Sequence, residues 1–238
     1  MIDRARLKKT AKDSLQLRKS SAYLVAAVYV GFLGLTDALI YALTGYDALI
    51  SKLEEALYVT PELSWPDVLA MAEPIAPLAL FFIAALLLYR IASHFCLKGF
   101  CLSLARGGDT GLSTFLDGLA LFFKVLLLYF LRLVLVFAGF FLFIVPGVYL
   151  WYGFRQADYI LLDNPRCGVL RCLRQSHRLM RGRRLELFWM DLSFLGWRVI
   201  DLAVFYQFSM WLFSLWLAPY SGVTYAGFYL ELCALSAQ

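Results

Sequence analysis

Charged side chains are scarce in this chain. Only 16% of its 238 residues are Asp, Glu, Lys or Arg, whereas 62% are apolar. Soluble domains are about half apolar and one-quarter charged, so this composition excludes an ordinary soluble fold. The apolar residues occur in runs of about 20, enough for a helix to cross a hydrocarbon core of about 30 Å. The composition therefore predicts an integral membrane protein.

Catalytic signatures are also missing. The sequence contains no H-E-x-x-H, no G-x-S-x-G and no Walker phosphate loop, and its two histidines leave little material for a hydrolytic site. Glu186 and Asp191 are the one carboxylate pair suited to acid and base work, but they lie beside arginines, as interfacial ion pairs do. We therefore expect a protein that is not an enzyme.

The acidic segment 45–73 has no cysteine, and the five cysteines of the chain all map to the inner side or the inner halves of the predicted spans. Structural disulfides are not expected in that compartment. Cysteines five residues apart on a helix point about 140° away from each other, unlike the ligands of a zinc site. We expect neither a metal nor a cofactor. The residues concerned are Cys96, Cys101, Cys167, Cys172 and Cys233, with His94 and His177 nearby.

The distribution of charge predicts the topology. Seven Lys and Arg residues in segment 1–20 place a basic N-terminal helix in the cytoplasm, and the acidic segment 45–73 is the expected outside loop. No cleavable signal peptide is expected, because the first apolar run, residues 21–43, is too long for one. The predicted spans cover residues 22–43, the run from Pro77 toward Arg106, and residues 116–145, 148–162, 185–205 and 208–230.

We thus predict an all-α fold in one integral membrane domain, residues 1–238: a polytopic helical bundle of about six transmembrane helices plus basic amphipathic interfacial helices. Both termini would lie in the cytoplasm, and the protein in the cytoplasmic membrane. As an alternative, residues 206–231 would form a broken or re-entrant segment around Pro219.

A second basic segment follows the fourth predicted span. Asn164 before Pro165 is typical of a helix start, and we expect a cytoplasmic amphipathic helix within residues 165–184 under the inner leaflet. The segment contains no acid. Its expected lipid head-group contacts are Arg166, Arg171, Arg174, Arg178, Arg181, Arg183 and Arg184.

Charges also fall inside the predicted spans. If Pro146-Gly147 closes a tight hairpin, Arg132 lies 14 residues before it and Asp158 lies 12 after it. Both are then about 20 Å from the turn on adjacent helices. Because an unpaired charge at that depth costs a few kcal/mol, we predict an ion pair between Arg132 and Asp158.

Four more residues extend this predicted intramembrane polar layer: Arg155, Asp191, Arg198 and Asp201. Arg155 would share the carboxylate of Asp158 or pair with Asp201. Two interpretations stay open. The layer is either a route for a substrate, ion or proton or a lipid head-group cavity, or it is a set of ion pairs that fix helix register without a ligand.

Five stretches resemble a family of bacterial multi-pass membrane proteins, the domain of unknown function 975. They are LKKTAKDSLQ, LKGFCLSLARG, FIVPGVYLWYGFRQADYILLDNP, SHRLMRGRRLELFWMDLSFLGW and PYSGVTYAGFYLEL, which together cover nearly the whole chain in order. The resemblance implies a polytopic bundle in the cytoplasmic membrane. It implies no activity, so no catalytic residue can be assigned from it.

Three functions are weighed on these grounds. The first is a non-enzymatic membrane protein that binds anionic lipids and acts in membrane organisation or envelope homeostasis. The second is a transporter or channel component for a small anionic or amphipathic compound, and the third and least supported is a lipid-processing enzyme. The expected partners are membrane lipids, above all anionic ones, and either further copies of the chain or another membrane protein. No nucleic acid is expected.

Overall fold

The computed structural model describes residues 2–17, 22–31, 34–35, 51, 54–55, 76–108, 111–205 and 212–236. Every regular element among these residues is a helix, which confirms the predicted all-α class. The chain divides into two compact units, residues 31–90 and the remainder. The outer part of the first predicted span and nearly all of the acidic segment 45–73 lie outside the described residues.

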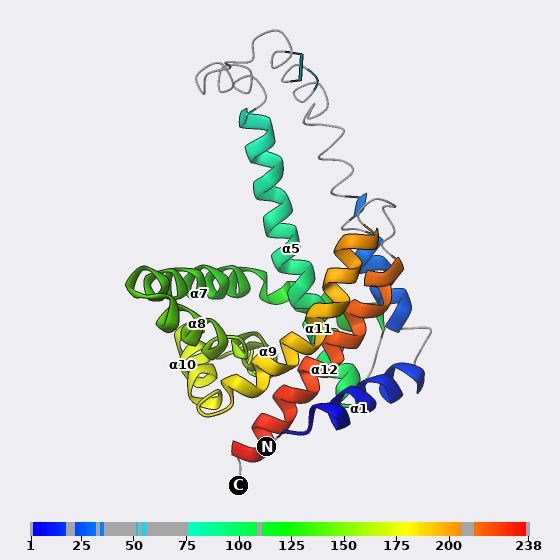
Figure 1. Ribbon diagram of the computed structural model, residues 1–238, viewed down its shortest axis with the longest axis vertical. Coiled ribbons are helices and arrows are strands. Elements are labelled where there is room, and N and C mark those ends of the chain that lie inside the picture. The colour runs from blue at the N-terminus through cyan, green and yellow to red at the C-terminus, as the bar shows by residue number, and fades with distance from the viewer. Residues whose placement is uncertain are drawn as a thin grey trace. The chain divides into compact units, whose positions relative to one another are not determined.

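The described elements follow one another in the order given next. They are α1 (Arg4–Leu17), α5 (Ala76–Ala105), α6 (Leu112–Leu116), the 3-10 helix η1 (Asp117–Leu121), α7 (Phe122–Leu142), α8 (Ile144–Gly153), α9 (Ala157–Asp163), α10 (Val169–Leu179), α11 (Arg184–Phe205) and α12 (Leu212–Ser236). Figure 1 labels all of them except α6 and η1. A further short apolar helix covers Ala22–Gly31.

Two helical stretches in the described part of the chain are long and apolar enough to cross a membrane, judged by length and composition. They are Leu80–Ala105 and Leu112–Leu142. Much of the second stretch is uncovered by the rest of the protein, and Phe123, Phe137 and Phe141 are 82%, 67% and 95% exposed. Apolar patches of this kind mark surfaces that contact membranes or other proteins. The predicted bundle of six spans is not established by these two stretches.

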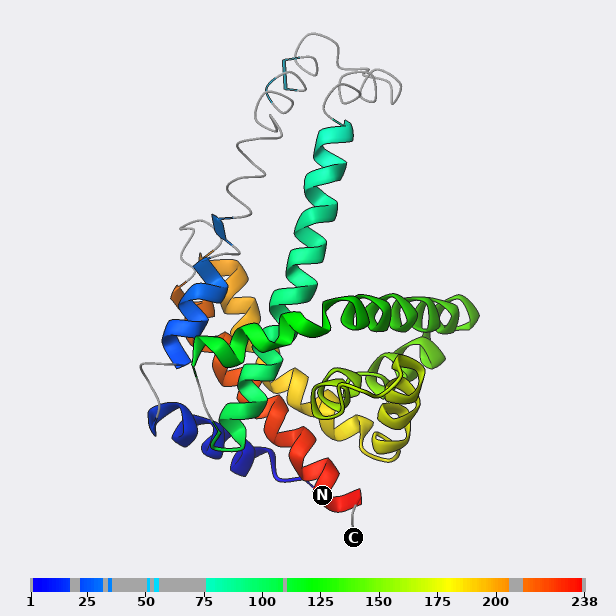
Figure 2. The same ribbon diagram turned by 180° about the vertical axis from the view of Figure 1, so that it is seen from behind.

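The hairpin between α7 and α8 turns three residues earlier than predicted. Phe143, in an extended conformation (φ −165°, ψ 159°), separates the two helices, and Pro146 and Gly147 belong to the first turn of α8. Gly147 serves close packing, since a Cβ there would lie 2.4 Å from the ring of Phe140, and a Cβ on Gly139 would lie 3.1 Å from the Gly147 Cα. The two helices pack side by side, as the view from behind shows (Figure 2).

The fourth predicted span, residues 148–162, is not one continuous helix. α8 ends at Gly153, a turn follows, and α9 begins at Ala157. α8 and α9 have 10 and 7 residues, whereas a spanning helix needs about 20. The expected helix start at Asn164-Pro165 is also displaced: these residues form a turn in which the Cys167 amide donates to the Asn164 carbonyl (2.8 Å), and α10 begins at Val169.

The predicted basic helices cover their apolar faces within the protein. In α1, Leu7, Ala11 and Leu15 are buried, and the helix packs against α12.

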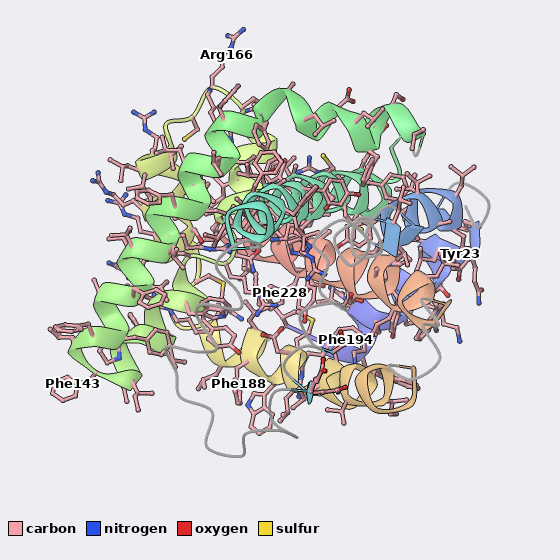
Figure 3. All side chains as sticks on the ribbon, turned by 90° about the horizontal axis from the view of Figure 1, so that it is seen from above. Tyr23, Phe143, Arg166, Phe188, Phe194 and Phe228 are labelled. Carbon is pink, nitrogen blue, oxygen red and sulfur yellow. The ribbon has the colours of Figure 1, made fainter. Side chains whose placement is uncertain are left out.

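α12 runs unbroken through Pro219, which favours a continuous helix over the re-entrant alternative. Phe194 and Phe228 lie in the same buried cluster, and both point into the interior in Figure 3, whereas Phe143 points outward.

Candidate functional site

A buried carboxylate joins three helices at what we call the Asp158 centre: Lys98 of α5, Tyr129 and Arg132 of α7, and Asp158 of α9. The Asp158 side chain is fully buried. Its Oδ2 atom accepts an ion-paired hydrogen bond from the Lys98 ammonium and lies 3.5 Å from Arg132 Nη1. The Tyr129 hydroxyl donates to the same oxygen at 3.4 Å, and the Arg132 guanidinium lies 4.4 Å from the centroid of the Tyr129 ring.

This centre contains two cations for one carboxylate. The second oxygen of Asp158, Oδ1, is buried without a hydrogen-bond partner among the described residues. The predicted pair of Arg132 with Asp158 is therefore found, while Lys98, which sequence analysis placed near the end of a span, is the partner that it missed. Lys98 is the only lysine of the 30-residue helix α5, and this signal could have identified it.

Asp191 of α11 is the middle of a second polar cluster. Arg155, in the turn between α8 and α9, forms an ion pair with Asp191 Oδ2. The hydroxyls of Tyr152 and Tyr225 donate to the same carboxylate at 3.2 and 2.6 Å. Arg155 thus pairs with Asp191, and among the described residues it forms no ion pair with Asp158, one of the two partners considered from sequence. The side chains of Arg198 and Asp201 lie outside the described residues.

A third carboxylate, Asp163 at the end of α9, binds Arg106 after α5 and the hydroxyl of Tyr229 of α12. The Arg106 Nη2 atom lies 2.8 Å from Oδ1 and 2.9 Å from Oδ2, and the Tyr229 hydroxyl donates to Oδ2 at 2.7 Å. Tyr229 also stacks on Tyr159, with 5.2 Å between ring centroids. Together the three carboxylates link α5, α7, α8, α9, α11 and α12. Two of them, Asp158 and Asp163, lie on the short helix α9.

Ser176 of α10 fixes the break between α8 and α9. The Ser176 hydroxyl donates to the Gly153 carbonyl at 2.7 Å and accepts from the backbone N–H of Gln156 at 3.2 Å.

His177, the next residue, lies against two aromatic side chains. Its ring contacts those of Tyr149 and Phe154, each with 5.7 Å between ring centroids. Burial and the nearby Arg184 and Arg181 lower the pKa of His177, so its imidazole is neutral near pH 7.

The outer face of α10 and the turns on either side of it carry what we call the basic surface. It consists of three exposed arginines of α10, Arg171, Arg174 and Arg178, with the exposed Arg166 before the helix and Arg181 after it. Figure 3 shows Arg166 pointing away from the protein. Within the described residues none of the five forms an ion pair. The other two predicted contacts are engaged: Arg183 pairs with Glu186 at 3.2 Å, and Arg184 covers the ring of Tyr149.

The opposite face of α10 is apolar and lies inside the protein. Val169, Cys172, Leu173 and Ser176 are buried, and the helix contacts α7, α8, α9 and α12. Burial raises the pKa of the Cys172 thiol to about 12, so the cysteine acts as an apolar filler. Among the described residues, no group of three His, Cys, Asp or Glu side chains could hold a metal ion. α10 is therefore anchored by the protein itself and presents its arginines outward.

The fold and these clusters define an all-helical protein with apolar helices suited to a membrane, ion pairs buried between its helices, and an uncompensated basic surface. The chain belongs to the family described as proteins of unknown function, DUF975, whose model matches residues 74–236. That match confirms the family resemblance seen in the sequence. Comparisons with curated proteins and with solved structures find no match.

Proposed function

We propose that the protein is a multi-pass protein of the cytoplasmic membrane, with both termini in the cytoplasm, that binds anionic lipids through the basic surface and acts in membrane organisation or envelope homeostasis. The observation that carries the proposal is the set of five exposed arginines on and beside α10, none of which has an acidic partner among the described residues. Each arginine near an anionic leaflet contributes about 1 kcal/mol.

A second observation supports the proposal, because the basic surface adjoins an apolar surface. α10 packs against α7, whose outward side chains include the exposed Leu127, Phe130 and Leu133. The Lys124 ammonium, near the start of α7, donates to the Pro165 carbonyl at 2.6 Å and ties the two segments together. Apolar side chains beside exposed cations match the acyl chains and phosphates of an anionic leaflet.

The proposal is tested on the detergent-purified full chain by adding a short-chain phosphatidylglycerol or its phosphatidylcholine counterpart. A ligand that binds the folded state raises the melting temperature. We expect phosphatidylglycerol to raise it more, and 0.5 M salt to remove most of the difference, because exposed charges are screened by salt (Debye length about 10 Å at 0.1 M). Equal shifts with both lipids would refute the proposal.

Transport of a small anion is the second candidate, and the Asp158 centre is the observation that favours it. Lys98 and Arg132 outnumber the one carboxylate, and a buried carboxylate oxygen has no partner among the described residues. Buried charges at membrane depth mark ion and substrate paths in many transporters. Anion flux into proteoliposomes that is unchanged by Lys98→Met, which removes the surplus cation and leaves Arg132 paired with Asp158, would exclude this route.

A further inference from the structure

An open groove of about 470 Å³ lies between α7 and the start of α10. Small-molecule sites in proteins commonly have volumes of about 300–1,000 Å³, so the groove is large enough for a ligand. Both apolar side chains and guanidinium groups line the groove. The residues are Leu127 and Leu131 of α7 with Gly168, Val169, Leu170, Arg171 and Arg174 around the start of α10.

The polar part of the groove lining suits a phosphate group. Arg171 and Arg174 are three residues apart, so their side chains lie on one side of the helix, and both are exposed. The first amides of a helix have no acceptor within the helix, and the N-cap residue Gly168 has no side chain to cap them. The helix dipole adds partial positive charge at the same end. None of the lining residues is acidic.

The apolar part of the groove lining suits an acyl chain. Leu127 is 50% exposed on α7 and Leu170 is 60% exposed on α10, and Leu131 lies one helical turn beyond Leu127. These side chains continue the exposed apolar surface of α7, which includes Phe130 and Val134. A free phosphate ion would contact only the guanidinium groups, whereas a phospholipid would contact both the guanidinium groups and the apolar side chains.

We propose that this groove is a discrete binding site for one anionic phospholipid, with its phosphate held by Arg171, Arg174 and the first amides of α10 and its acyl chains lying along Leu127 and Leu131. The site rests on the proposed lipid-binding function and adds a location and a stoichiometry. Binding to the basic surface alone would be diffuse, with all five exposed arginines contributing alike.

Native mass spectrometry of the detergent-purified full chain tests the site through two matched charge variants. Arg171→Gln with Arg174→Gln removes two charges from the groove, whereas Arg178→Gln with Arg181→Gln removes two from the same basic surface outside it. We expect the wild-type chain to retain one phosphatidylglycerol per chain. The groove variant should bind it roughly 30-fold more weakly, equivalent to about 2 kcal/mol, and the outer variant within about threefold of wild type.

A third variant fills the groove without a change of charge. A Cβ on Gly168 would meet nothing within 4 Å, and the backbone of Gly168 (φ −70°, ψ 143°) accepts any residue. Gly168→Trp should therefore fold normally, as circular dichroism would verify, and lose the retained lipid, while Gly168→Ala keeps it. Inorganic phosphate at 10 mM should not displace the lipid, since it cannot use the apolar lining.

Several results would overturn the site: equal losses in the two arginine variants, lipid retained by Gly168→Trp, displacement by inorganic phosphate, or no lipid retained by wild type. Each is distinguishable from failure of the proposed function. If phosphatidylglycerol still stabilises the wild-type chain more than phosphatidylcholine, anionic-lipid binding stands and only the discrete site is wrong. Retention of a peptide or protein by the groove in place of lipid would also contradict the assignment.

Discussion

Removing the carboxylate of the Asp158 centre should destabilise the protein far more than removing its nearest cation. Asp158 is fully buried and faces Lys98 and Arg132, whose side chains are 17% and 19% exposed. Asp158→Asn leaves two cations with no carboxylate, and breaking a buried pair in this way costs about 3–5 kcal/mol. Lys98→Met leaves a balanced pair of Arg132 with Asp158 and costs about 1.5–3 kcal/mol, the loss of one charge-assisted hydrogen bond.

The same count of charges predicts that a second substitution restores part of the stability that Asp158→Asn removes. In the double variant Asp158→Asn with Lys98→Met, one of the two uncompensated cations is gone, so the double variant should be more stable than Asp158→Asn alone. Neighbouring charges couple in this non-additive way, and a double-mutant cycle measures the coupling. Glu186→Gln is the control, because the half-buried pair of Glu186 with Arg183 is worth about 0–1 kcal/mol.

The assay is thermal unfolding of the full chain in a neutral detergent. For a chain of this size each kcal/mol shifts the melting temperature by about 2–4 °C, so Asp158→Asn should lower it by roughly 6–20 °C. If Lys98→Met is as damaging as Asp158→Asn, or if the double variant is no more stable than Asp158→Asn alone, the charge balance that we assign to this centre is wrong.

Three further predictions use the same unfolding assay. Gly147→Ala should cost about 1–3 kcal/mol, because its Cβ would lie 2.4 Å from the ring of Phe140; Gly196→Ala, with nothing within 4 Å, should cost nothing, and equal effects would refute the packing role of Gly147. Tyr225→Phe should cost about 1.5–3 kcal/mol through loss of its 2.6 Å hydrogen bond to a carboxylate, and an unchanged melting temperature would contradict that bond. Stability should fall as pH drops below about 6.5, because the folded-state pKa of His177 is lowered and the unfolded chain binds its proton first; His177→Gln should remove this part of the pH dependence, and an unaltered profile would show that another group is responsible.

The sequence predicted the parts of the fold that depend on composition and on charge. Scarce charge and long apolar runs indicated helices suited to a membrane, and two such stretches are present. Counting helical rise from Pro146 placed Arg132 and Asp158 at matching depth, and the structure pairs them at 3.5 Å. The pair forms although the turn lies three residues earlier than counted and a break after Gly153 separates α8 from α9, which carries Asp158.

Helix boundaries predicted from local sequence were wrong where tertiary contacts determine them. Pro146-Gly147 has the composition of a turn, yet a proline fits the first turn of a helix and Gly147 is needed for contact with Phe140. The break after Gly153 has no proline to signal it, and it is held by Ser176, which lies 23 residues further along the chain. No local pattern could reveal that bond.

The partners of the buried charges were only partly predictable for the same reason. Arg155 and Asp158 lie three residues apart, which suggested a shared carboxylate, but the turn after Gly153 separates their directions. Arg155 pairs with Asp191 of α11, supported by Tyr225 of α12. Pairing across helices depends on the rotation of each helix about its axis, and apolar residues on every side of a span leave that rotation undetermined.

The central claim is that the basic surface selects anionic lipid, and the most direct measurement is the ratio of lipid affinities at the protein in a bilayer. The full chain is reconstituted into bilayers that contain brominated phosphatidylglycerol or brominated phosphatidylcholine, and quenching of its six tryptophans reports which lipid it contacts. We predict a preference for phosphatidylglycerol that falls with salt and with the four changes Arg171, Arg174, Arg178 and Arg181→Gln, and that survives the same four changes to Lys. Equal quenching by both lipids in the wild-type chain, or a preference unaffected by the four glutamines, would contradict the account.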